Sequence, residues 1–183
     1  MITFLYGSDS YRRLVKFNEL VAAFRLKHPN AAFKTFDFEE NPESWPEFRS
    51  FAVQNSFFDE YKLGVLRGVF SLGDGKGIID FLKKLADSDR FFIYIVEEKK
   101  PAKKFEFLLE KPVQFQKFDV LTRKELAAFI QIEALRLNVS LEPGAETQLV
   151  NYFAGTNSDS WQIVRELEKI SLAGFPRPIS ADN

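Results

Sequence analysis

The first glycine of the chain, Gly7, lies between a short apolar run and a helical pattern, which is the position of a phosphate-binding turn. Phosphate binding there requires Gly-x-x-x-x-Gly-Lys-Ser/Thr, in which glycines admit the phosphates, lysine neutralises charge and the hydroxyl holds magnesium. The register from Gly7 places Arg12 at the second glycine, Arg13 at the lysine and Leu14 at the hydroxyl, while Asp9 adds a negative charge. We therefore expect a degenerate phosphate loop, with Gly7, Asp9, Arg12 and Arg13, that binds no nucleotide.

A nucleotide-hydrolysing site also needs an aspartate at the end of an apolar strand to hold the magnesium shell. The third expected strand ends instead in Arg67 and Gly68. The fourth ends in Glu97 and Glu98, which we interpret as a solvated strand end because glutamates are usually exposed. An alternative is a small Mg-dependent phosphotransferase in which Asp9 and these two glutamates surround the ion. That alternative lacks glycine-rich phosphate wrapping and an acid–base histidine, so we expect no cofactor, no metal site and no intrinsic catalysis.

The composition excludes several other classes of site. The 183 residues include no cysteine and one histidine, so disulfides, thiolate nucleophiles, cysteine-ligated metals and multi-histidine metal sites are impossible. A formal net charge of −1 excludes binding of nucleic acid through the overall field, but not through a local basic patch. The apolar start is too short for a signal peptide and no stretch is long enough to span a membrane, so we expect a cytoplasmic protein without membrane contact.

Apolar runs and helical patterns alternate along the first part of the chain. The runs expected to form strands are Ile2–Tyr6, Phe33–Phe38, Tyr61–Val69, Arg90–Val96 and Val113–Phe118. The first intervening helix is expected from Ser10, and Pro42 and Ser44 open the second. Two more are expected around Ile78 to Leu85 and over the short basic stretch Lys103–Glu110. Such alternation predicts an α/β fold with a mostly parallel sheet and helices on both faces.

The pattern changes at Asp119, after which three helical segments joined by short loops predict a small bundle. The segments are Thr122–Leu137, Glu142–Ala154 and Ser158–Leu172. A sheet followed by such a bundle is the layout of a nucleotide-binding ATPase with a helical lid. The expected domains are 1–119 for the sheet, 120–175 for the three-helix lid and 176–183 for a frayed tail.

Several residues have expected local roles in the helices. Thr122 and Glu125 have the spacing of a capping box, and Gly155 is expected at a helix C-cap. The two tryptophans, Trp45 and Trp161, lie at helical spacing with other apolar residues, so we expect both in the core.

Arg12 and Arg13 lie at the start of a helix, where their charge opposes the helix dipole. We expect a salt bridge to Asp9 to compensate. His28 precedes Pro29 at the end of the same helix, where a capping role is expected rather than catalysis.

Four short motifs follow one another along nearly the whole chain. They are Leu5-Tyr-Gly-Ser-Asp9, Ser56-Phe-Phe-Asp-Glu-Tyr-Lys-Leu-Gly-Val-Leu66, Ile93-Tyr-Ile-Val-Glu-Glu-Lys-Lys-Pro-Ala-Lys-Lys104, and Gly155-Thr-Asn with Arg165-Glu-Leu-Glu-Lys-Ile170. Each motif alone is weak, but in this order and spacing they resemble the delta subunit of bacterial DNA polymerase III, a clamp-loader subunit. The resemblance implies a degenerate AAA+ (P-loop NTPase-like) module, a parallel α/β sheet with a three-helix lid, without ATPase activity.

The resemblance also implies a clamp-binding site. In the family, apolar residues just before the third strand enter a hydrophobic pocket of the sliding clamp; here these positions are Ser56, Phe57 and Phe58, preceded by Asn55. Neighbouring side chains on a helix or strand point in different directions, so Phe57 and Phe58 cannot both enter one core. An exposed aromatic pair is an anchor that fills a partner's pocket. The alternative is that one of the two packs under the sheet, as some pairs do in a chain with 21 phenylalanines.

The implied function is in DNA replication: a delta-like subunit that binds and helps open the beta sliding clamp of DNA polymerase III. Delta subunits usually continue into a third helical domain, the collar, whereas this chain stops after the lid. We therefore expect the chain to bind the gamma/tau and delta prime subunits if a collar domain exists. DNA is expected to be contacted through the assembled complex. The remaining alternative is a degenerate AAA+ scaffold with another partner.

A lysine cluster follows the fourth expected strand. Lys99, Lys100, Lys103 and Lys104 are a candidate contact for DNA phosphates or an acidic partner. The alternative is an ordinary solvated face, which is common for an isolated cluster in a near-neutral protein.

Overall fold

The computed structural model describes most of the chain in two compact units, Met1–Phe118 and Asp119–Asn183. The residues described are 1–54, 60–73, 76–156, 159–173 and 178–180.

The first unit is built on a five-stranded sheet in which every neighbouring pair is parallel. Its strands are β1 (Ile2–Tyr6), β2 (Ala32–Asp37), β3 (Lys62–Arg67), β4 (Phe91–Glu97) and β5 (Gln114–Lys117), in the order β2-β3-β4-β1-β5. These bounds agree with the predicted strands to within a few residues, and the predicted α/β class is confirmed.

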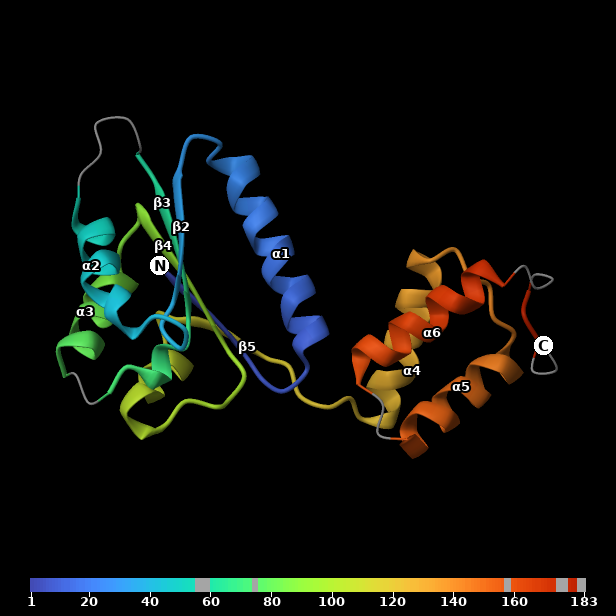
Figure 1. The fold of residues 1–183 in the computed structure, drawn as a ribbon. Helices are drawn as coiled ribbons and strands as arrows, with labels where there is room; N and C mark the ends of the chain where they lie inside the picture. The colour runs from blue at the N-terminus through green and yellow to red at the C-terminus, as the bar shows by residue number, and fades with distance from the viewer. Residues whose placement is uncertain (55–59, 74–75, 157–158, 174–177, 181–183) are drawn as a thin grey trace. The chain divides into compact units, whose positions relative to one another are not determined.

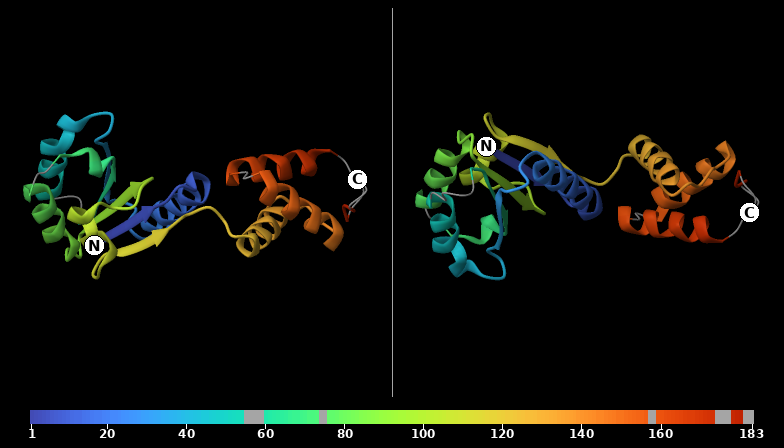
Figure 2. Two further views of the ribbon diagram at one scale, coloured as in Figure 1. Left: turned by 90° about the horizontal axis from the view of Figure 1, so that it is seen from below. Right: turned by 90° about the horizontal axis from the view of Figure 1, so that it is seen from above.

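Helices cover both faces of the sheet, as Figures 1 and 2 show, with α1 on one face and α2 and α3 on the other. The helical elements are α1 (Ser10–Lys27), η1 (Pro42–Ser44), α2 (Trp45–Val53), η2 (Val69–Ser71), α3 (Lys76–Ala86) and η3 (Lys103–Leu109). The stretch Lys103–Leu109 is a 3-10 helix with Phe105 and Leu108 buried. His28 is the C-cap of α1, and its backbone N–H donates to the Phe24 carbonyl, as predicted.

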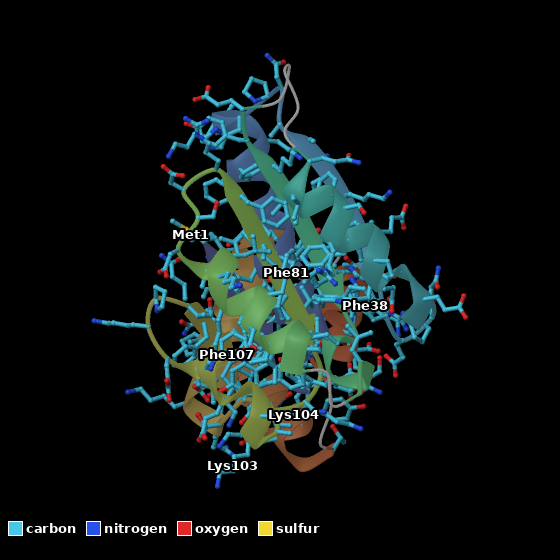
Figure 3. The ribbon with its side chains drawn as sticks, turned by 90° about the vertical axis from the view of Figure 1, so that its left-hand side faces the viewer. Met1, Phe38, Phe81, Lys103, Lys104 and Phe107 are labelled. Atoms are coloured by element: carbon cyan, nitrogen blue, oxygen red, sulfur yellow. The ribbon has the colours of Figure 1, made fainter. Side chains whose placement is uncertain are left out.

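Alternation along each strand divides the core between the two faces. Leu63 and Val65 of β3 pack with Phe24 of α1, whereas Leu66 packs with Phe48 of α2 on the other face. Phenylalanine fills much of this second layer, and Phe36 meets Phe48 edge to face with ring centroids 5.3 Å apart. The side chains of this layer are drawn in Figure 3, where Phe38 and Phe81 are labelled.

The described residues of the second unit form three helices, as the sequence predicts. They are α4 (Arg123–Arg136), α5 (Pro143–Thr156) and α6 (Ser160–Leu172). The capping box of Thr122 and Glu125 is present at the start of α4, and Asp159 with Gln162 forms another at the start of α6.

Three local expectations for this unit are wrong. Gly155 is not a C-cap, because α5 continues through it to Thr156. Trp161 is 37% exposed and does not belong to the buried core, whereas Trp45 of the first unit is partly buried and packs against it. The expected frayed tail contains Ile179, which is 7% exposed and forms a parallel bridge with Leu141.

Within the described part of the chain, no helix combines the length and apolar character needed to cross a membrane.

Candidate functional site

The strand order places a candidate ligand site at the carboxyl edge of the sheet, where β1 lies beside β4. The chain leaves β1 toward β2 on one side of the sheet and leaves β4 toward β5 on the other, so the direction of the connections reverses between these two strands. Ligands of open α/β sheets bind in the crevice at such a reversal. At this edge Tyr6 of β1 is in register with Glu97 of β4 and Lys117 of β5. Arg67 ends β3, in register with Asp37 of β2. The predicted degenerate phosphate loop, which follows β1, lies at the same edge.

Gly7 makes a close backbone contact instead of an open phosphate cradle. Its φ is +127°, and a Cβ on Gly7 would lie 2.1 Å from the Phe118 carbonyl oxygen. The Asp9 N–H donates to that carbonyl at 2.9 Å, and the Phe118 N–H donates to the Tyr6 carbonyl at 2.7 Å. The glycine is therefore required because the residue after β5 packs directly against the turn.

Asp9 occupies the helix N-terminus with its own carboxylate. Its side chain accepts a hydrogen bond from the Arg12 N–H at 3.0 Å and lies 3.5 Å from the Arg12 guanidinium. The predicted salt bridge is thus confirmed for Arg12. Only 6% of the Asp9 side chain is exposed, so a buried negative charge lies where a helix N-terminus would otherwise attract a phosphate.

Arg13 is tied to the same turn. Its guanidinium donates to the Gly7 carbonyl oxygen. Burial lowers the pKa of Arg13, while Glu98, Asp9 and Glu97 act in the opposite direction. Arg13, which takes the position of the phosphate-binding lysine in the sequence, therefore binds the backbone of the turn itself.

The end of β3 carries no carboxylate, as expected. Arg67 is exposed, and its guanidinium lies 5.8 Å from the centre of the Phe17 ring. Gly68 follows with φ +64°, and a Cβ there would lie 2.5 Å from the Glu39 backbone nitrogen. A cation and a tight turn thus take the place where a magnesium-binding aspartate would lie.

Glu97 corrects the expectation of a solvated strand end. It is 9% exposed, and its Oε1 accepts a 2.6 Å hydrogen bond from the Val69 N–H. Burial raises the pKa of Glu97 to about 7; the Val69 and Phe70 amides lower it, whereas Glu39 and Asp37 raise it further. Sequence reasoning missed this role, although the position of Glu97 at the end of a central, wholly apolar strand was a signal for burial. Glu98, in contrast, is exposed.

The predicted lysine cluster is exposed to solvent. Lys99, Lys100, Lys103 and Lys104 all have exposed side chains. Lys104 donates to the Gly73 carbonyl at 3.2 Å and lies 5.4 Å from the centre of the Phe105 ring. Figure 3 shows Lys103 and Lys104 at the rim of the face that α3 and η3 form.

The predicted clamp-binding residues Ser56, Phe57 and Phe58, and Asn55 before them, lie outside the described residues. The flanks are described: α2 ends at Val53 with Gln54 as its cap, and β3 begins at Lys62. A groove of about 490 Å³ lies along α2, lined by Pro46, Arg49, Ser50, Val53 and Gln54. Val53 is 65% exposed.

The side chains that could bind a metal ion are not clustered in the part of the chain that is described. No group of three or more His, Asp or Glu side chains is arranged there to hold a metal ion. Asp9 caps a helix and Glu97 binds a backbone amide, so two of the three carboxylates of the alternative phosphotransferase are engaged in structural contacts.

Comparisons with known proteins agree in fold. No family model matches the chain, and no curated protein matches it in sequence. Among solved structures, the Bacillus subtilis DNA clamp loader delta protein (YqeN) matches with a TM-score of 0.59 and 21% identity, over 99% of this chain and 56% of that one. A Thermotoga maritima RuvB protein matches with a TM-score of 0.57 and 14% identity, over 98% of this chain and 58% of that one.

The chain therefore spans a little over half the length of both neighbours, each of which has an AAA+ fold. The resemblance stated from the sequence motifs is confirmed at the level of the fold. The chain therefore shares its fold with both neighbours, and its own residues close the turn after β1.

Proposed function

We propose that the chain acts in DNA replication as a delta-like clamp-loader subunit that binds and helps open the sliding clamp, without hydrolysing ATP. The observation that carries the proposal is a delta-like fold whose phosphate turn is filled by Asp9, Arg13 and the Phe118 backbone. A protein with this fold and a closed turn is suited to protein binding rather than nucleotide chemistry.

The contact with the clamp is assigned to Ser56, Phe57 and Phe58. Two adjacent aromatic side chains between α2 and β3 provide anchors of the kind that fill a hydrophobic pocket. Among the described residues that precede this segment, Val53 has an exposed apolar side chain, and a groove lies along α2.

The test is calorimetric titration of the chain with a bacterial beta sliding clamp, with and without Mg-ATP. We expect binding whose affinity is the same in both conditions, and binding weakened by Phe57→Ala or Phe58→Ala. Phe115→Ala is the matched control, because Phe115 is 49% exposed on β5, away from the 55–58 segment in sequence. Equal affinities for all three variants and the original chain would remove the assignment of the segment.

The lysine cluster is assigned a secondary role as a contact for DNA phosphates or an acidic partner in the assembled complex. Its four exposed ammonium groups support that role. Replacing Lys99, Lys100 and Lys103 by Gln should reduce binding of the complex to DNA, and the reduction should shrink as salt concentration rises. Unchanged DNA binding at low salt would show that the lysine cluster is an ordinary solvated face.

A degenerate AAA+ scaffold with another partner is the alternative, and the same titration separates the two. Absence of clamp binding, together with a heat of ATP binding, would instead favour the phosphotransferase.

A further inference from the structure

The β2 strand forms an open edge of the sheet. It is last in the strand order and pairs only with β3. The Phe38 N–H, just after β2, donates to the Arg67 carbonyl at 2.9 Å, so this residue directs its backbone groups toward β3. Because successive residues of a strand alternate in this direction, Phe33, Thr35 and Asp37 direct their backbone groups away from the sheet. Such an edge is a template for pairing with a further strand.

The charges beside this edge are divided between its two ends. The last turn of α1, which leads into the start of β2, carries Arg25 and Lys27, both of them exposed. The end of β2 and the turn after it carry the carboxylates of Asp37, Glu39 and Glu40. No lysine or arginine occurs in residues 35–48. The edge is therefore basic at its start and acidic at its end.

Arg25 lies over the start of the edge. Its guanidinium is 4.7 Å from the centre of the Phe33 ring, and Phe33 is 37% exposed. The ion pairs formed among the described residues do not include Arg25. A guanidinium that stacks on a ring still presents its N–H donors to a carboxylate. A strand that brings a carboxylate opposite Phe33 thus gains an ion pair with Arg25.

We propose that this edge pairs, in antiparallel orientation, with the same edge of a second copy of the chain. An edge with a single sign of charge would fit a partner of the opposite sign, whereas an edge with one sign at each end is complementary to itself when reversed. A twofold axis produces this reversal, because the start of each β2 then faces the end of the other. The inference goes beyond the proposed function and does not depend on clamp binding.

The register that fits best has Thr35 on the twofold axis. Thr35 then exchanges backbone hydrogen bonds with Thr35 of the second copy, and Phe33 faces Asp37 of the second copy. The guanidinium of Arg25 on Phe33 therefore meets the carboxylate of Asp37, and it does so twice in the dimer. A register centred on Lys34 would instead place two lysine side chains directly opposite each other, which is destabilising.

The first measurement is sedimentation of the full chain, alone, over a wide range of micromolar concentrations. Strands of six residues bury less surface than a permanent interface does, so we expect monomer and dimer in exchange over this range. The average mass should rise from that of the monomer toward that of the dimer as concentration increases.

Charge reversal tests the contact between Arg25 and Asp37. Arg25→Glu alone, or Asp37→Lys alone, places like charges at both symmetric contacts, and each should weaken self-association about tenfold or more. An equimolar mixture of the two variants should associate as the original chain does, because both contacts then join opposite charges. Lys83→Glu is the matched control: Lys83 of α3 is also an exposed cation beside a ring, 5.4 Å from the centre of Phe107, and its reversal should change nothing.

A cross-link tests the register independently of charge. The chain has no cysteine, so Thr35→Cys introduces a single thiol. Directly opposite residues that exchange hydrogen bonds across antiparallel strands have Cα atoms about 5.5 Å apart, within the range of a disulfide. Mild oxidation should therefore convert Thr35→Cys to a covalent dimer, whereas Asn18→Cys, at an exposed position of α1, should remain largely monomeric. This measurement also decides the register if Asp37→Lys does not fold, since the Asp37 carboxylate accepts from the Glu39 N–H in its own turn.

The results that would overturn the proposal are distinct. A chain that stays monomeric over the whole range leaves the edge to a strand of another protein. A dimer that Arg25→Glu does not weaken uses another surface. Folded charge variants that fail to associate when mixed, or a Thr35→Cys chain that cross-links no better than Asn18→Cys, exclude the antiparallel register.

Discussion

The carboxylate of Glu97 lies 2.6 Å from the backbone nitrogen of Val69, which joins the end of β4 to the turn that follows β3. An aspartate or glutamate at the carboxyl edge of a nucleotide-binding sheet is commonly read as a metal ligand. Here the carboxylate faces inward to a neighbouring turn, and it is buried. The geometry assigns Glu97 to holding the edge of the sheet together.

The burial of the Glu97 carboxyl group makes stability depend on pH. The pKa of Glu97 is raised by burial from 4.5 to about 7, so the folded state favours the protonated form. Its contribution is therefore fully present below about pH 4.5 and is lost as pH rises through about 7. In the original chain, the free energy of unfolding should fall by at most about 3 kcal/mol across this pH window. We expect this fall to be absent in Glu97→Gln, because glutamine stays neutral. Urea unfolding at a series of pH values measures it.

Glu98→Gln is the control for that series, because Glu98 is the next residue and is exposed. Its pH profile should follow that of the original chain. A Glu97→Gln profile with the same slope as the original chain would show that Glu97 does not carry the pH dependence.

Substitution by alanine should lower the free energy of unfolding at Gly7 and raise it at Gly155. Gly7→Ala places a Cβ 2.1 Å from the Phe118 carbonyl oxygen at a φ of +127°, so we expect a loss of about 3 kcal/mol or more. Gly155→Ala lies within α5 with open space around the new Cβ, so a gain of about 0.5 kcal/mol is expected. Chemical denaturation gives both values, and a tolerated Gly7→Ala would mean that the turn is not closed on Phe118.

Asp9 should stabilise the chain chiefly as a cap. Asp9→Ala removes the hydrogen bond to the Arg12 N–H and should cost about 1 kcal/mol, whereas Asp9→Asn keeps an acceptor and should cost much less. Ser8→Ala, at an exposed neighbouring position, is the control. Equal losses for Asn and Ala, measured by chemical denaturation, would assign the effect to the Arg12 ion pair instead.

The sheet was predictable because its strands are distinct. The three central strands, β1, β3 and β4, are mostly apolar runs between turn or helix signals, and parallel strands buried on both faces have this pattern. The capping box of Thr122 was equally local, since both of its partners lie within one turn. Such features depend on neighbours in sequence alone.

Several of the features that the sequence did not predict depend on how elements pack. Glu97 marks the end of a strand, but its pattern does not show that the turn at Val69 covers it. Trp161 follows buried Ser160 and therefore lies about 100° around α6 from it, at the border of the buried face of the helix. The spacing of apolar residues did not distinguish this border from the centre of the buried face. Lys62 lies within the expected strand Tyr61–Val69, yet its hydrogen bonds to α2 depend on how helix and strand pack.

The chain near residue 179 provides the last prediction, for the second unit. Ile179 is 7% exposed; its N–H donates to the Ser140 carbonyl at 2.8 Å, and its carbonyl accepts from the Glu142 N–H at 2.9 Å. Ile179→Ala should therefore destabilise this unit by about 2 kcal/mol, whereas Leu172→Ala, at an 85% exposed position, should change little. Each unit holds one tryptophan, so the fluorescence of Trp161 in a Trp45→Phe background follows the unfolding of the second unit alone. Equal midpoints for the two variants would contradict the packing of Ile179, because burial is what separates the two positions.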